Sequence, residues 1–279
     1  MNSASFICVA IALVAAVSPG AWGQGGPPFR TDDPGTPGNR HWEVNVGLAG
    51  ERTQSAGSYS IPNIDVNYGL GDRIQLKYEL PLAVAEHRDS GGSVTAGLGN
   101  SLIGMKYRFF EHRPRTSTAN SEPTFSFSAY PQLILSNPTR SVGRGVIEPG
   151  PRFFLPMEAS ARIGPLRFVA ETGYWFNRSD AANAWIRGLM LGHEFRKGPG
   201  LYLEFYDQAD VKGTGGKPAA GESTVGAGGR WPIVRNRSVL LTGMAGRSVA
   251  NLTHTNSQPR WIAYVGMQFL FGPHVAAHE

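Results

Sequence analysis

The chain contains a single cysteine, Cys8, which lies near its amino terminus. If export removes that segment, the mature protein has no thiol, which excludes disulfide bonds, thiolate metal sites and cysteine catalysis. The sequence also lacks a run of about 18 apolar residues, so it predicts no membrane-spanning helix. The net charge is only +5, and the basic residues are scattered without interleaved aromatic residues. These features give no support to nucleic-acid binding.

Histidine spacing does not indicate a metal site among the seven histidines. His274 and His278 are four residues apart, but no helix is predicted there, so they do not form a zincin-type pair. The glycine-rich stretch 213–217 lacks the spacing of a phosphate-binding loop. The sequence therefore predicts no metal and no cofactor.

The longest apolar run extends from Phe6 to Val17. It is followed by Ala21-Trp22-Gly23, which has the small–x–small pattern of a signal-peptidase site. Residues 1–23 are therefore predicted to form a secretory signal peptide. The alternative is an uncleaved anchor helix, for which this apolar run is too short.

The stretch Ile64–Leu80 has the clearest pattern in the chain. Apolar side chains alternate with polar ones from Ile64 to Tyr68, and the alternation resumes from Ile74 after Gly71-Asp72. Successive side chains of a strand point to opposite faces, so the segment predicts an antiparallel hairpin with one apolar and one polar face. Each arm approaches the roughly 9–11 residues that a tilted strand needs to cross a bilayer. The alternative is a soluble sandwich with the apolar face as its core.

Similar alternation recurs along residues 41–271 and predicts about twelve strands. The segment before them, 24–40, is rich in proline and glycine, and we expect an extended N-terminal arm on the periplasmic side. Residues 272–279 form a C-terminal tail. The predicted fold is all-β, a transmembrane antiparallel up-and-down β-barrel in the bacterial outer membrane, with apolar side chains facing lipid.

The connections between the predicted strands support this fold because long and short ones alternate, as in outer-membrane barrels. Long loops are predicted at 51–60, 81–96 and 207–222, and the segment 110–123 is an exception, since a short turn is expected there. Tryptophans lie near the strand ends, where two aromatic girdles are expected. These tryptophans are Trp42, Trp175, Trp185, Trp231 and Trp261.

Ionisable and tyrosine side chains occupy the polar face of the predicted strands, which in a barrel faces the lumen. One interpretation is a narrow, water-filled passage of mixed charge, with an amphipathic site for an aromatic ligand. The alternative is that these groups pair across the lumen and close it. The segment 185–195 has no clear inner face, because Arg187 and His193 lie on one side and Glu194 on the other. The candidate lumen-lining residues are Glu43, Asp65, Arg73, Lys77, Glu79, Lys106, Arg108, Tyr130, Glu158, Arg162, Glu171, Tyr202, Glu204 and Tyr206.

Three segments resemble a bacterial family of outer-membrane transporters named for the MetA-pathway of phenol degradation. They are Pro27–Glu43 (PPFRTDDPGTPGNRHWE), the hairpin Asn67–Leu82 and the final strand Trp261–Phe271. The resemblance implies an outer-membrane β-barrel and the uptake of aromatic or other small apolar molecules. It assigns no binding residues.

The sequence thus predicts a passive channel or transporter for small solutes, and not an enzyme. One alternative is a non-transporting structural or surface-interaction barrel that displays its long outer loops. Another is an outer-membrane hydrolase, for which His254 or His193 is the candidate base. The expected partners are outer-membrane lipid and lipopolysaccharide, the barrel-assembly machinery and a small-molecule solute, with no nucleic acid.

Overall fold

A computed structural model describes residues 27–88, 92–113, 123–177, 183–195, 199–211, 221–234, 238–249 and 260–273. The predicted signal peptide and most of the predicted tail lie outside these residues. Within them, no helix is long and apolar enough to cross a membrane.

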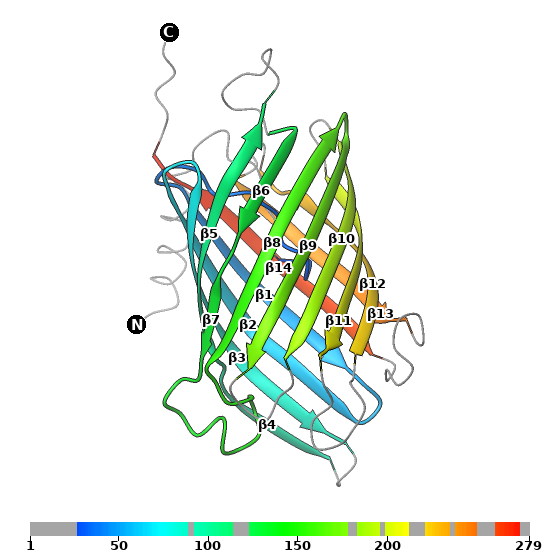
Figure 1. Cartoon of the computed structure of the whole chain (residues 1–279). Helices are drawn as coiled ribbons and strands as arrows, with labels where there is room; N and C mark the ends of the chain where they lie inside the picture. Colours follow the sequence, from blue (N-terminus) through cyan, green and yellow to red (C-terminus); the bar gives the residue numbers. More distant parts are fainter. Residues whose placement is uncertain are drawn as a thin grey trace.

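In the described part of the chain, fourteen strands form one antiparallel sheet that closes on itself (Figure 1). β4 and β5 both pair with β3 and act as one interrupted strand, and β6 and β7 likewise share the place between β5 and β8. The wall therefore has twelve strands, which confirms the predicted fold class. The bounds are β1 (Trp42–Arg52), β2 (Ala56–Leu70), β3 (Ile74–His87), β4 (Ser93–Leu98), β5 (Ser101–His112), β6 (Phe125–Ala129), β7 (Gln132–Leu135), β8 (Arg152–Ile163), β9 (Leu166–Asn177), β10 (Ala184–Glu194), β11 (Gly200–Asp210), β12 (Gly221–Pro232), β13 (Val239–Ser248) and β14 (Trp261–Phe271).

The hairpin predicted at 64–80 is present as the parts of β2 and β3 next to their connecting turn, with Leu70 opposite Ile74. The turn between them contains Gly71 at φ 68°, a left-handed conformation that glycine adopts without strain. Ile64 and Leu76 are exposed on the outer surface, whereas Asp65 is buried. Large apolar side chains are exposed in the same way around the barrel, and lipid covers such a belt in a membrane.

The two ends of the barrel differ in their connections. β1 begins and β14 ends at the same end, which lies at the top of Figure 1 and has the tight turns 71–73 and 164–165. Short turns are typical of the periplasmic side, so we assign this end to the periplasm and the opposite end to the cell exterior. The long connection 136–151 lies at the outer end.

Two of the predicted long loops were wrong. The segment 51–60 is almost entirely strand, because β1 and β2 are joined by residues 53–55 alone. Residues 81–87 and 93–96 also continue the sheet, with Leu82 opposite Leu98 and His87 opposite Ser93. The polar residues in this part of the sequence suggested a loop, but pairing with a neighbouring strand satisfies their backbone hydrogen-bonding groups equally well.

β10 has an apolar inner face, which explains why the sequence left its orientation open. Ile186 and Met190 point into the barrel and are buried, whereas Arg187 is on the outer face. Trp175 also differs from the prediction of an outer girdle: its indole stacks on the buried Phe154 ring inside the barrel, at 4.4 Å between ring centroids. The other tryptophans of the predicted girdles are exposed on the outer surface: Trp42, Trp185, Trp231 and Trp261.

Candidate functional site in the barrel lumen

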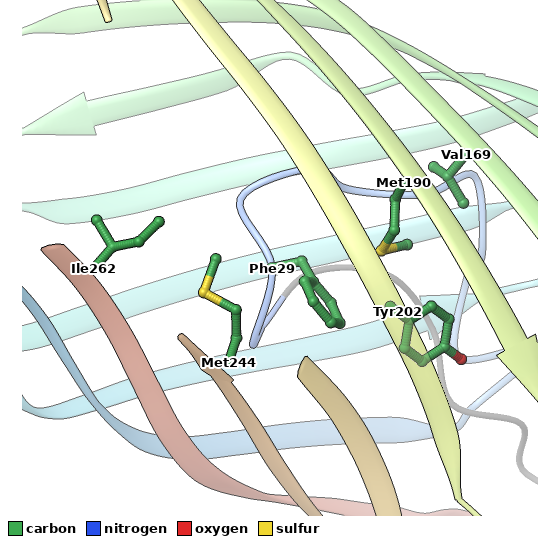
Figure 2. Close-up of a cluster of buried hydrophobic side chains, with 6 residues drawn as sticks. All are labelled: Phe29, Val169, Met190, Tyr202, Met244 and Ile262. Atoms are coloured by element: carbon green, nitrogen blue, oxygen red, sulfur yellow. The ribbon is translucent and has the colours of Figure 1, made fainter. Parts of the chain in front are cut away.

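The N-terminal arm, residues 27–41, lies partly inside the barrel. Phe29, Thr31 and Asp33 are buried, and Thr31 is 0% exposed. Figure 2 shows the arm looping between the strands, with Phe29 among side chains of the barrel wall. The sequence predicted an extended arm on the periplasmic side. The structure instead brings the first part of the arm into the lumen, where it becomes part of the candidate site.

Two backbone hydrogen bonds hold the arm against the wall. The Thr31 N–H donates to Glu204 Oε1 at 2.6 Å, and the Asp32 N–H donates to Glu171 Oε2 at 2.8 Å. The wall residue beside Thr31 is Gly188 of β10, where an added Cβ would collide with the Thr31 side chain. Glycine at this position therefore allows the arm to approach the wall closely.

Buried ion pairs fix the two aspartates of the arm. Lys106 Nζ lies 3.0 Å from Asp32 Oδ1 and 3.3 Å from Glu158 Oε2, and it donates a hydrogen bond to the Asp33 carbonyl oxygen. The Asp33 carboxylate pairs with Arg167 Nη2 at 2.8 Å. Because these charges are removed from bulk water, the loss of one partner leaves the other uncompensated, at a cost of about 3–5 kcal/mol.

Apolar contacts hold the inner end of the arm. The Phe29 ring meets the Tyr202 ring edge to face, with centroids 5.3 Å apart. In Figure 2 it lies between Met244 on one side and Met190 and Tyr202 on the other. The full cluster comprises Phe29, Val169, Met190, Tyr202, Met244 and Ile262.

Arg30 lies at the boundary between the arm and the open part of the lumen. Its guanidinium is 4.1 Å from the centroid of the Tyr206 ring, and its Nη1 is 3.8 Å from Glu222 Oε1. Burial lowers the pKa of Arg30, but Tyr206, Glu51 and Glu222 raise it by more, so the net pKa lies above the ordinary arginine value. The guanidinium therefore remains a cation in the lumen.

A polar network covers the lumen side of β1, β2 and β3. Asn45 Nδ2 donates to Glu43 at 3.1 Å and to Asp65 at 3.2 Å. Lys77 Nζ lies 3.2 Å from carboxylate oxygens of both Asp65 and Glu79. These groups pair with near neighbours along the wall, and the arm fills part of the lumen beside them.

A cavity of about 370 Å³ lies beside the inner end of the arm, towards the outer end of the barrel. The arm forms one side of it with Pro27, Pro28, Phe29, Arg30 and Asp32. Apolar side chains, among them the Phe154–Trp175 stack and Ile186, line much of the rest. Ionisable groups also reach the cavity, including Lys77, Glu79 and Glu171. The lining is therefore amphipathic.

Of the predicted lumen residues, Arg73 departs from the set, because it lies in the turn 71–73 and is exposed. Lys77, Glu79 and Arg162 are half-buried. Arg108 donates to the Asp72 carbonyl oxygen at 2.6 Å near the periplasmic end. The remaining residues are buried: Glu43, Asp65, Lys106, Arg108, Tyr130, Glu158, Glu171, Tyr202, Glu204 and Tyr206.

Sequence reasoning missed the arm residues of this site. The signal was present in Arg30-Thr31-Asp32-Asp33, a charged stretch within an otherwise proline- and glycine-rich segment. Alternation cannot assign such a segment to the inside or outside, because it is not a strand. The inner apolar residues of β10 were missed because both faces of that strand carry apolar side chains.

Metal binding and hydrolysis are two other chemistries that histidine and acidic side chains serve in proteins. The described residues contain no group of three His, Cys, Asp or Glu side chains that could hold a metal ion. His193 is half-buried on β10, in ring contact with Phe195 on the outer side. His254, the other candidate base, lies outside the described residues.

Comparisons with known proteins agree with this architecture. The family model described as MetA-pathway of phenol degradation matches residues 26–257. A search of curated proteins finds no match. Among solved structures, an outer-membrane channel from Pseudomonas putida F1 is similar, with a TM-score of 0.60 and 14% identity over 88% of this chain and 98% of that one.

Two porins are also similar in structure. The NanC porin has a TM-score of 0.52 at 8% identity, and the KdgM porin a TM-score of 0.50 at 11% identity. Each match covers 81% of this chain and 98% of the porin. At these identities the likeness establishes the barrel fold alone.

Proposed function

This chain belongs to the MetA-pathway of phenol degradation family and forms a bacterial outer-membrane β-barrel, and we propose that it is a passive channel for small amphipathic solutes, aromatic compounds among them. The observation that carries the proposal is the amphipathic cavity inside the closed barrel, bounded by the arm. Solute enters this cavity from the outer end and passes the arm to reach the periplasm. A concentration gradient drives the flux.

The lining of the cavity supports an amphipathic solute. The stacked Phe154 and Trp175 rings offer an aromatic surface, and aromatic pairs contribute about 0.5–1.5 kcal/mol beyond their buried area. Arg30 and Lys77 place cations at the same cavity, and Glu79 and Glu171 place carboxylates there. A solute with an apolar ring and a polar substituent can therefore satisfy both parts of the lining.

In this proposal the arm keeps the channel from acting as an open pore for water and ions. It occupies the lumen next to the cavity and is held by the Lys106 and Arg167 ion pairs. Mixed charge in the lumen gives no strong ion preference, since selective pores use rings of one sign. We infer that solute transfer requires a displacement of the arm from part of its contacts.

Solute efflux from liposomes tests this function. The probes are 4-hydroxybenzoate and gluconate, which both carry one carboxylate but differ in aromatic character. Trp175→Leu removes the inner stack while keeping an apolar side chain. It should lower the ratio of 4-hydroxybenzoate to gluconate flux roughly twofold to tenfold, the equivalent of one aromatic pair.

Trp185→Leu is the matched control, because Trp185 lies on the neighbouring strand β10 but is exposed on the outer surface. Its flux ratio should equal that of the wild-type protein. If neither probe leaves the liposomes faster than from empty ones, the channel proposal fails and a non-transporting barrel is favoured. If both tryptophan variants change the ratio equally, the cavity is not the solute site.

A further inference from the structure

The outer surface of the barrel carries a short row of basic and aromatic side chains near the outer end. β1, β14 and β13 are neighbours in the sheet, and their register places Arg52 opposite Trp261 and Trp261 opposite Arg247. All three side chains are exposed on the outward face, and Trp261 is 61% exposed. Directly opposed residues have Cβ atoms about 4.5–5.5 Å apart, so two guanidinium groups flank one indole ring.

The two arginines of this row have no carboxylate in ion-pair contact among the described residues. Arg247 lies with its guanidinium carbon 5.3 Å from the centroid of the Trp261 ring. Glu86 is an acidic group in electrostatic range of Arg52. Both Glu86 oxygens already accept hydrogen bonds from Arg88, each at 2.9 Å, and one also accepts from Tyr59. The row therefore carries excess positive charge.

Another arginine on the outer surface of the barrel differs from these two, because a carboxylate of the protein balances its charge. Arg187 of β10 pairs with Asp207 Oδ2 at 3.2 Å, and Ser223 donates to the other Asp207 oxygen. Its charge is thus balanced within the protein. Within the described part of the chain Arg52 and Arg247 have no such partner, which leaves them available to an external anion.

The position of the row on the barrel indicates which kind of anion binds there. It lies at the edge of the apolar belt, since Val265 and Leu241 are exposed on the same strands towards the membrane centre. An anion bound here therefore lies where acyl chains begin. Guanidinium groups bind phosphate through charge-assisted, often bidentate hydrogen bonds, and an interfacial indole packs against acyl chains or sugar rings.

We propose that Arg52, Trp261 and Arg247 form a binding site for a phosphate group of lipopolysaccharide, the phosphorylated lipid of the outer leaflet. The arginines bind the phosphate from either side, and Trp261 contacts the lipid between them. Such a site fixes the rotation and depth of the barrel in the outer leaflet. It also requires the outer end to be the one opposite the start of β1 and the end of β14.

Lipid binding to the purified full-length barrel in detergent tests the site, by native mass spectrometry with lipopolysaccharide titrated in. The double variant R52Q/R247Q removes both charges at exposed positions. Each lost charge-assisted hydrogen bond weakens binding roughly tenfold or more, so the loss of two should weaken binding at least about a hundredfold. Dephosphorylated lipopolysaccharide should bind the wild-type protein as weakly as intact lipopolysaccharide binds the variant.

The control variant is Arg73→Ala, which removes an exposed arginine at the periplasmic end and should bind like the wild-type protein. The mobility of unboiled samples on a gel shows whether each variant is folded. If the double variant does not fold, R247Q alone is tested, and its binding should weaken by an intermediate amount. Unchanged binding by the arginine variants, or an equal loss in Arg73→Ala, overturns the proposal. Equal binding of phosphatidylglycerol overturns it too, because the site then takes any anionic lipid.

Discussion

The two sides of the lumen hold the arm by different means. On one side, Lys106 of β5 forms ion pairs with Asp32 of the arm and Glu158 of β8, and it donates a hydrogen bond to the Asp33 carbonyl oxygen. On the other side, the strands from β9 to β14 bind Phe29 through the apolar cluster. Glu204 and Glu171 accept hydrogen bonds from the backbone N–H groups of Thr31 and Asp32, and Arg167 of β9 adds a single ion pair to the Asp33 carboxylate. Figure 2 shows the apolar side. We call these the charged side and the apolar side.

This difference suggests that one side of the lumen holds the arm in place, while the other side lets a solute pass. Buried charges tolerate little displacement, because a separated pair leaves each partner desolvated and uncompensated. Apolar contacts are not directional, so an aromatic solute can replace part of the Phe29 contact at little cost. We infer that the charged side fixes the register of the arm, while the apolar side is the one a solute competes for.

Lys106→Met should have the largest effect, because it removes the centre of the charged side. Asp32 and Glu158 lose their shared cation, which costs about 3–5 kcal/mol for a buried pair. The arm should then leave the lumen most of the time. In a Thr31→Cys background, maleimide labelling should rise more than about a hundredfold. Thr31 is fully buried, and the mature chain is predicted to have no other thiol.

The double variant Lys106→Met/Glu158→Gln is the matched control for that result. It removes the unbalanced charge of Glu158 and should recover part of the arm docking, because a neutral buried pair costs less than a lone charge. Equal labelling in the single and double variants would mean that the charge of Glu158 does not influence the arm. Wild-type labelling in Lys106→Met would contradict the role of the charged side altogether.

Phe29→Ala should have a smaller effect, because it removes only the apolar anchor. Complete burial of a phenylalanine side chain stabilises by about 1.5–3 kcal/mol. Labelling of the Thr31→Cys reporter should therefore rise about tenfold to a hundredfold. Phe29→Leu keeps most of the apolar area, so its labelling should rise less than that of Phe29→Ala. If Phe29→Ala increases the labelling of the reporter more than Lys106→Met does, the apolar side holds the arm more strongly and the comparison between the sides is reversed.

The charged side was largely predictable from the sequence, and the reason is physical. An ionised side chain in the middle of a transmembrane strand cannot face lipid cheaply, so parity assigns it to the lumen. Asp65, Lys106 and Glu158 are buried on the side that parity assigned. The hairpin around Gly71 was likewise set by local alternation and turn chemistry.

The apolar side was not predictable in this way. An apolar residue such as Ile186 or Met190 is acceptable both towards lipid and towards a packed interior, so alternation loses its meaning on β10. Trp175 was assigned to an outer girdle because it lies near a strand end, although it stacks on Phe154 inside. Its inward place depends on neighbours that are distant in sequence, and no local pattern encodes them.

Substitution of Arg73 should have the smallest effect on stability. It tests whether the side chain lies where the alternation of the sequence placed it or where the structure places it. Parity assigned it to the lumen beside Lys77, whereas it lies in the turn 71–73 and is exposed. Arg73→Ala should therefore change the unfolding free energy in urea by less than about 0.5 kcal/mol, as exposed substitutions do. Arg108→Ala should cost about 1–3 kcal/mol, because Arg108 binds the Asp72 carbonyl oxygen at 2.6 Å and Glu111 at 3.0 Å. An equal loss of unfolding free energy in both variants would indicate that the Arg73 side chain is buried in the lumen. The charged side would then extend into the periplasmic turn.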